Sequence, residues 1–75
     1  MEVKTIVTQK SVTVRVNRKE KVSDVVALFS IVLKDSSEFN VIPYETGADI
    51  VYYGRKSKCF DLLVALAYNY KVDMI

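Results

Sequence analysis

The sequence predicts an α+β fold in which a four-stranded, mostly antiparallel sheet carries two helices on one face. Three observations favour this fold: β-branched residues alternate near the start, two apolar stretches have a helical period, and a short glycine-containing loop separates two strands. The expected order is strand, helix, strand, strand, helix, strand, and the first ten residues can add an N-terminal strand. The 75 residues are expected to form a single domain, 1–75.

Alternation of β-branched residues predicts strand structure over the N-terminal part of the chain. Residues 1–10 and 11–17 both show this period, which is cleaner in the second stretch. The positions expected on one face are Val3, Thr5, Val7, Val12, Val14 and Val16. Two strands joined at Gln9-Lys10 and one long strand are both compatible with the pattern, because this pair lacks the Asn-Gly chemistry of tight hairpins.

A first helix is predicted from about residue 21 or 23 to residue 34. Ser23 and Asp24 favour a helix start, since a capping side chain and a negative charge stabilise that end. The inner side is expected to consist of Val22, Val25, Val26, Phe29 and Leu33. Leu28 and Ile31 fall on the opposite side, where a two-layer domain would expose them.

A turn is predicted at residues 35–38, followed by two strands at residues 39–44 and 49–53. The loop between them contains Gly47, which is typical of a hairpin with one left-handed residue. Pro43 cannot donate a backbone hydrogen bond, so we expect it at the loop end of its strand or facing an edge.

Ser57 is predicted to cap a second helix, and residues 71–75 are predicted to form the last strand. The inner side of this helix is expected to carry Cys59, Leu62, Leu63 and Leu66. In the last strand, Val72 and Met74 share one face.

This order, with Lys56-Ser57 opening the second helix, resembles the histidine-containing phosphocarrier (HPr-like) family of bacterial sugar phosphotransferase systems. The resemblance covers roughly residue 12 to the C-terminus and implies that the first two helices dock partners. It also implies that Ser57 is a regulatory phosphorylation site, although a shift of two residues would place Cys59 there. The chain has no histidine and stops before a third helix, so we expect a shortened relative without phosphocarrier activity.

We therefore expect a non-catalytic regulatory or adaptor domain that acts through protein–protein contact. The third helix of the family would cover one face of the sheet, and without it this face must be covered by the N-terminal extension or by a second protein. Because exposed apolar surface on a small domain usually marks an interface, we expect a homodimer or a stable complex with another protein. The residues expected to bind protein are Val22, Leu28, Ile31, Ser57, Lys58 and Val64.

The basic stretch 54–58 has two interpretations. Ser57 as a helix cap needs no partner, whereas phosphorylated Ser57 would gain from the helix dipole and its basic neighbours. The stretch lacks the phosphate-loop pattern and can be a weak anion site or a solvated turn. Cys59 is expected to be a small buried hydrophobic residue, with a reactive thiol as the alternative.

The second functional hypothesis is a small nucleic-acid-binding module. Tyrosines near basic residues on an open sheet face would stack bases, although half-buried packing is the commoner role of strand tyrosines. The tyrosines are Tyr44, Tyr52, Tyr53, Tyr68 and Tyr70. The basic residues expected to contact phosphate are Arg15, Arg18, Lys19, Lys21, Arg55, Lys56 and Lys58. A phage- or plasmid-type inhibitor that blocks a larger complex is the third hypothesis.

An enzyme is not expected, because the sequence supplies no nucleophile–base pair. Without histidine and with a single cysteine, neither a metal site nor a cofactor is expected. The sequence has no signal peptide and no apolar run of membrane-spanning length, so we expect no membrane contact and a cytoplasmic location.

Overall fold

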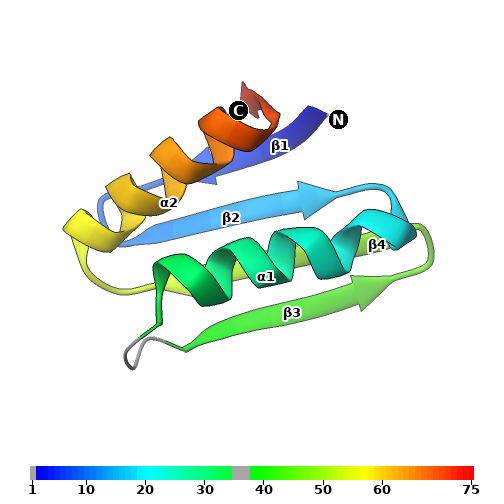
Figure 1. Ribbon diagram of the computed structural model, residues 1–75, viewed down its shortest axis with the longest axis horizontal. Helices are drawn as coiled ribbons and strands as arrows, with labels where there is room; N and C mark the ends of the chain where they lie inside the picture. Colours follow the sequence, from blue (N-terminus) through cyan, green and yellow to red (C-terminus); the bar gives the residue numbers. More distant parts are fainter. Residues whose placement is uncertain (1, 35–37) are drawn as a thin grey trace.

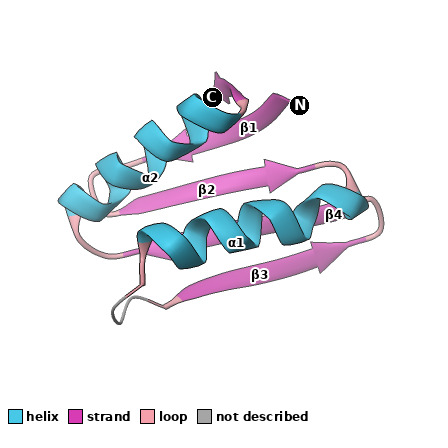
Figure 2. Ribbon diagram, viewed as in Figure 1, coloured by secondary structure: helices cyan, strands magenta, loops and turns pink. Residues whose placement is uncertain are grey.

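The computed structural model describes residues 2–34 and 38–75, which form a mixed five-stranded sheet with two helices on one of its faces (Figures 1 and 2). The predicted α+β class is confirmed, and the sheet has five strands because the N-terminal residues add the extra strand that the prediction left open. Its strand order is β3-β4-β2-β1-β5. Most of the turn predicted at residues 35–38 lies outside the described residues.

The N-terminal alternation forms a hairpin of two strands, β1 (Glu2–Val7) and β2 (Ser11–Val16). They pair antiparallel with Val7 opposite Val12, so the two-strand prediction is confirmed over the single long strand. Side-chain oxygens stabilise the connection instead of an Asn-Gly turn. The hydroxyls of Thr8 and Ser11 are 2.7 Å apart, and the Lys10 N–H donates to Thr8 Oγ1 over 3.2 Å.

Strand β1 lies inside the sheet, between β2 and the last strand, β5 (Lys71–Met74). The β1–β5 pairing is parallel, with Val3 opposite Val72. The N-terminal residues therefore extend the sheet and do not cover its bare face, because their alternating apolar side chains join the core beneath the helices. The N-terminal extension was therefore wrongly predicted as a cover for the bare sheet face.

The second hairpin consists of β3 (Phe39–Tyr44) and β4 (Gly47–Tyr53), joined by two residues. No described residue has a positive φ, so the predicted left-handed residue is absent from the part of the chain that the structure describes. Gly47 is required for space instead: a Cβ there would overlap the carbonyl oxygen of Val16 on β2. Tyr44 donates its hydroxyl hydrogen to the same oxygen over 3.2 Å.

The helices α1 (Val22–Val32) and α2 (Lys56–Asn69) run side by side in opposite directions (Figure 1). A short 3-10 helix, η1 (Lys19–Lys21), leads into α1. Lys21 occupies the N-cap position of α1 without a side-chain cap hydrogen bond, so Ser23 does not have the predicted capping role. The helix begins earlier because η1 already supplies a helical turn before Ser23.

The core lies between the helices and the sheet. Val12, Val14 and Val16 are fully buried there, as their alternation predicts, and α1 contributes Val25 and Phe29. The opposite sheet face is bare and carries charges of both signs. On that face, Glu2 lies opposite Lys71 and Lys4 opposite Asp73 across the β1–β5 pairing, and Arg15 binds Asp49 with Nε 3.1 Å from Oδ1.

Candidate protein-binding face

One line of apolar side chains runs along the outer surface of α2. Cys59, Leu62 and Leu66 face the core and are buried. On the other side, residues four positions apart share a face because of the helical period. Phe60, Val64 and Tyr68 form this line, with 64%, 50% and 89% of their surface exposed.

Helix α1 contributes Val32 to the same surface. Ile31 is 70% exposed, as predicted, and Val32 lies against α2. Leu28 is half-buried and packs on the core, so its predicted exposure is wrong. It lies one turn before Val32, on the same side of α1. Val22 also packs partly on the core, on the side toward β3.

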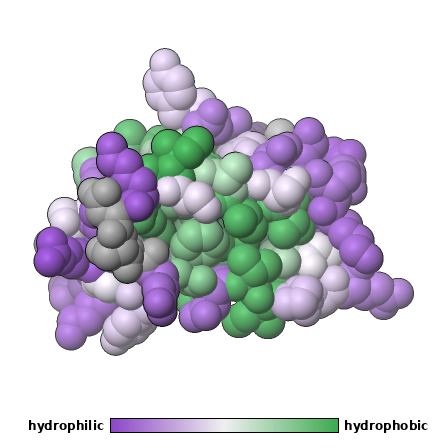
Figure 3. Space-filling model, turned by 60° about the horizontal axis from the view of Figure 1, so that its bottom comes forward, coloured by the Kyte–Doolittle hydropathy of each residue, from purple (hydrophilic) through white to green (hydrophobic). Residues whose placement is uncertain are grey.

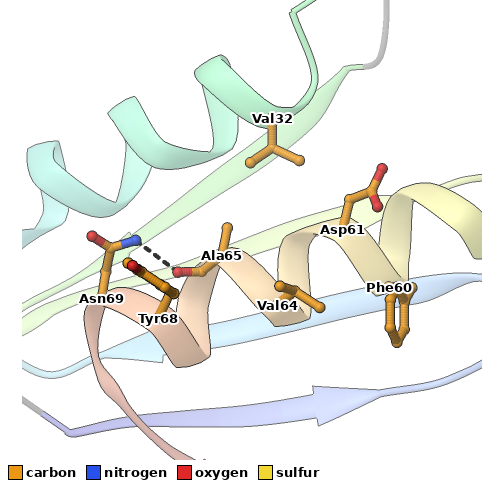
Figure 4. Close-up of a pocket in the computed structure, with 7 residues that line it drawn as sticks. All are labelled: Val32, Phe60, Asp61, Val64, Ala65, Tyr68 and Asn69. Carbon is orange, nitrogen blue, oxygen red and sulfur yellow. Dashed lines mark hydrogen bonds between the residues drawn. The ribbon is translucent and has the colours of Figure 1, made fainter.

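The surface is hollowed into a groove of roughly 440 Å³ between α1 and α2. Its lining is mainly apolar, and in Figure 4 Val32 points from α1 toward the α2 residues. Asp61 supplies a carboxylate, and Asn69 donates its side-chain N–H to the Ala65 carbonyl over 2.8 Å. The lining residues are Val32, Phe60, Asp61, Val64, Ala65, Tyr68 and Asn69. This shape can hold an apolar segment of another molecule.

A second groove of roughly 670 Å³ lies between α1 and strand β3. Val22 and Val26 line it from α1, and Val41 and Pro43 line it from β3. Figure 3, which brings the lower side of Figure 1 forward, shows apolar side chains gathered in the middle of this face with hydrophilic ones at both ends. The apolar surface thus extends over the helix layer toward the sheet edge.

Ser57 does not cap α2. The cap position belongs to Arg55, which makes no side-chain cap hydrogen bond, and Ser57 is exposed in the first turn of the helix. The predicted cap is wrong because the helix begins at Lys56, so its cap position lies two residues before Ser57. Lys58 is half-buried beside it.

Gly54 has a role that the sequence did not indicate. Tyr52 is buried, and its side chain passes beneath Gly54, where a Cβ would overlap the phenol hydroxyl. The Arg55 N–H donates to this hydroxyl oxygen over 3.0 Å. The tyrosine therefore satisfies a backbone donor at the start of α2. The feature of the sequence that could have indicated this packing is a glycine two residues after a tyrosine in a strand.

The seven basic residues predicted for nucleic acid do not form one surface. Arg18, Lys19 and Lys21 follow the end of β2, and the segment 55–58 follows the end of β4. These strands are antiparallel, with Ser11 opposite Tyr53, so the two segments lie at opposite ends of the sheet (Figure 1). Arg15 is separate on the bare sheet face, where its hydrogen bond to Asp49 raises the pKa of its guanidinium.

The five tyrosines are also dispersed. Tyr52 is buried beneath the helices, Tyr68 projects from α2, and Tyr70 is half-buried next to the core. Tyr53 is 73% exposed at the end of β4, and Tyr44 is half-buried with its hydroxyl bonded to Val16 and Asn17. The five tyrosines therefore do not gather on the bare sheet face, where they would be needed to stack nucleic-acid bases.

Cys59 is buried, as predicted for a structural residue, and burial raises the pKa of its thiol. A raised pKa lowers the thiolate fraction, which disfavours reactivity. Among residues 2–34 and 38–75, no three histidine, cysteine, aspartate or glutamate side chains are grouped so that they could hold a metal ion. Within the same residues, neither helix combines the length and apolar character needed to cross a bilayer.

Comparisons with protein-family models, with curated proteins and with solved structures gave no match for this chain. The class of protein is therefore defined by its architecture and surface alone. It is a small α+β domain whose helix layer presents an apolar groove to solvent.

Proposed function

We propose that the chain is a non-catalytic regulatory or adaptor domain that binds a protein partner in the groove between α1 and α2. The observation that carries this proposal is the exposed line of Phe60, Val64 and Tyr68, with Val32 of α1 in the same groove. Fully burying one large apolar side chain contributes about 1.5–3 kcal/mol. Several such side chains held together in water favour an interface over a plain solvated surface.

The spacing of this line suits an amphipathic helix as the ligand. Helix-in-groove recognition uses apolar anchors that recur every three or four residues, and the groove offers apolar contacts at that interval. Asp61 lies in the groove lining, so a basic residue beside the apolar row of the partner helix would be complementary. The proposed ligand is therefore a helix with an apolar face and a basic flank.

The exposed Ser57 supports regulation of the same groove. It lies one turn before Phe60 and Asp61, between the basic residues Lys56 and Lys58. A phosphate would be stabilised by the helix start and by these lysines. It would also add negative charge near one end of the groove and so strengthen binding of a basic helix. This role agrees with what the HPr-like resemblance implies for Ser57.

The test is affinity purification from the native host, with three forms of the protein used as bait. Tyr68→Asp places a charge in the groove, and Tyr53→Asp makes the same change at an exposed tyrosine on the bare sheet face. Circular dichroism first establishes that both variants are folded. We expect a protein that wild type and Tyr53→Asp retain and Tyr68→Asp loses.

Identical partners for all three baits would contradict the proposal. Binding should weaken only modestly as salt rises, because most of the proposed contact is apolar and releases few counterions. A steep loss with rising salt, together with recovered nucleic acid, would instead support the nucleic-acid hypothesis.

A further inference from the structure

The two edges of the sheet differ in length and charge. The β5 edge has four residues, of which Lys71 and Asp73 are charged. Charged side chains and short length are common protections against strand pairing between molecules. The β3 edge has six residues, FNVIPY, and none of its side chains is charged. One edge is therefore protected and the other, apart from Pro43, is not.

Strand β3 is also exposed on both of its faces. Val41, on the helix side, is 40% exposed, and Ile42, on the bare side, is 55% exposed. Helix α1 packs over β4 and leaves the groove next to β3 open. A strand that packed only within its own domain would have one apolar face and one polar face. The apolar residues on both faces favour a further neighbour along this edge.

The position of Pro43 identifies the groups that point away from the sheet. Proline has no N–H and is tolerated in an edge strand where its nitrogen faces outward. Orientation alternates along a strand, so Val41 and Phe39 also direct their N–H and C=O groups outward. These groups can accept and donate hydrogen bonds to an added strand.

We propose that the β3 strands of two copies pair antiparallel about a two-fold axis at Val41, joining their sheets into one. The two Val41 residues exchange N–H···O=C bonds, and Phe39 N–H donates to the Pro43 carbonyl of the second copy at both ends. Because Pro43 has no N–H, the hydrogen bond that would run from Pro43 to the Phe39 carbonyl of the other copy is absent at each end. With the axis perpendicular to the sheet, all helices lie on one side of the joined sheet.

A second copy fits this edge because the strand is complementary to itself. Antiparallel pairing of two uncharged strands brings no like charges together, whereas a charged strand paired with itself would face its own charges. The contact is isologous and closes at two copies, since the remaining edges are the charged β5 strands. The grooves between α1 and α2 stay open, so this pairing does not depend on the proposed function.

Sedimentation equilibrium of the wild type and two matched variants tests the pairing. Ile42→Lys and Met74→Lys both place a charge at an apolar strand residue that is about half exposed, 55% and 53%, on β3 and β5 respectively. We expect a mass of about 17 kDa for the wild type, twice the 8.5 kDa chain. Met74→Lys should keep this mass, and Ile42→Lys should fall to half of it while retaining its circular dichroism spectrum.

A monomeric wild type at high micromolar concentration would overturn the proposal. So would a dimer that survives Ile42→Lys and dissociates with Tyr68→Asp, because that result assigns self-association to the helix groove. A dimeric wild type that captures no partner, or that captures the same partners as Tyr68→Asp, would in contrast refute the proposed function alone.

Crosslinking supplies a readout that does not depend on disrupting the fold. Val41→Cys should give a crosslinked dimer with a short bis-maleimide reagent, because the two introduced thiols lie beside the axis. Met74→Cys, on the other edge, is the control. The wild type corrects for Cys59, which is buried. Equal crosslinking of the two variants would contradict pairing through β3.

Discussion

Replacing Gly47 by alanine should destabilise the protein because the site has no room for a methyl group. A Cβ at Gly47 would stand 2.9 Å from the Val16 carbonyl carbon and closer still to its oxygen. The atoms that must move belong to the backbone of β2, where Val16 pairs with Ala48. The same carbonyl oxygen accepts the Tyr44 hydroxyl hydrogen. One methyl group therefore disturbs the β2–β4 pairing and a side-chain hydrogen bond.

The expected cost combines two contributions. Overpacking typically costs about 1–3 kcal/mol, and a lost intramolecular hydrogen bond costs about 0.5–1.5 kcal/mol. Together they lower the free energy of unfolding by about 3 kcal/mol, a large part of the roughly 4–11 kcal/mol expected for a domain of this size. The melting temperature should fall by about 12–24 °C.

Urea and thermal unfolding followed by far-ultraviolet circular dichroism measure this cost. Thr46→Ala, at the exposed loop residue next to Gly47, is the control and should change the free energy by less than about 0.5 kcal/mol. A Gly47→Ala protein as stable as this control would refute the packing described for the β3–β4 hairpin.

Three further changes test the fold. Tyr52→Phe removes the acceptor of the Arg55 N–H and should lower the free energy of unfolding in urea by about 1 kcal/mol; an unchanged stability would contradict this role of the hydroxyl. Burial raises the pKa of the Cys59 thiol above 9.0, so the unfolded chain loses this proton first as pH rises. This thiol should leave the free energy of unfolding unchanged below pH 9 and lower it as pH rises above that value. Cys59→Ala should reduce this fall in stability with pH. An equal fall in the wild type and the variant would contradict the raised pKa of Cys59. Arg15→Ala breaks an exposed ion pair with Asp49 and should cost less than about 1 kcal/mol, which a larger measured loss would contradict.

Patterns that depend on a short local period were predicted well from the sequence. The bounds of β3 agree with the prediction, and the buried valines of β2 lie at the predicted alternate positions. The line of Phe60, Val64 and Tyr68 was only partly anticipated. Val64 was predicted at the surface, but Phe60 was not named, although it lies four residues before Val64 on the same helical face.

Features that depend on the tertiary arrangement were not predicted. Ser57 has a favourable capping side chain, yet the cap position lies two residues earlier at Arg55, whose N–H donates to the Tyr52 hydroxyl oxygen. Strand β3 lies at the edge of the sheet because β5 pairs with β1 and not with β3. No local period in the sequence indicates that pairing. Leu28 is half-buried because it packs against the core.

The parallel pairing of β1 and β5 joins the two ends of the chain and has a consequence for the timing of folding. Glu2 lies opposite Lys71, so β1 meets this neighbour only when residues 71–74 have been synthesised. Until then the β1–β2 hairpin has an open edge, and closing the pair requires ordering nearly the whole chain. Contacts between such distant positions slow folding. Loss of the last five residues should therefore leave β1 as an unpaired edge strand and expose the nascent protein to association with other strands.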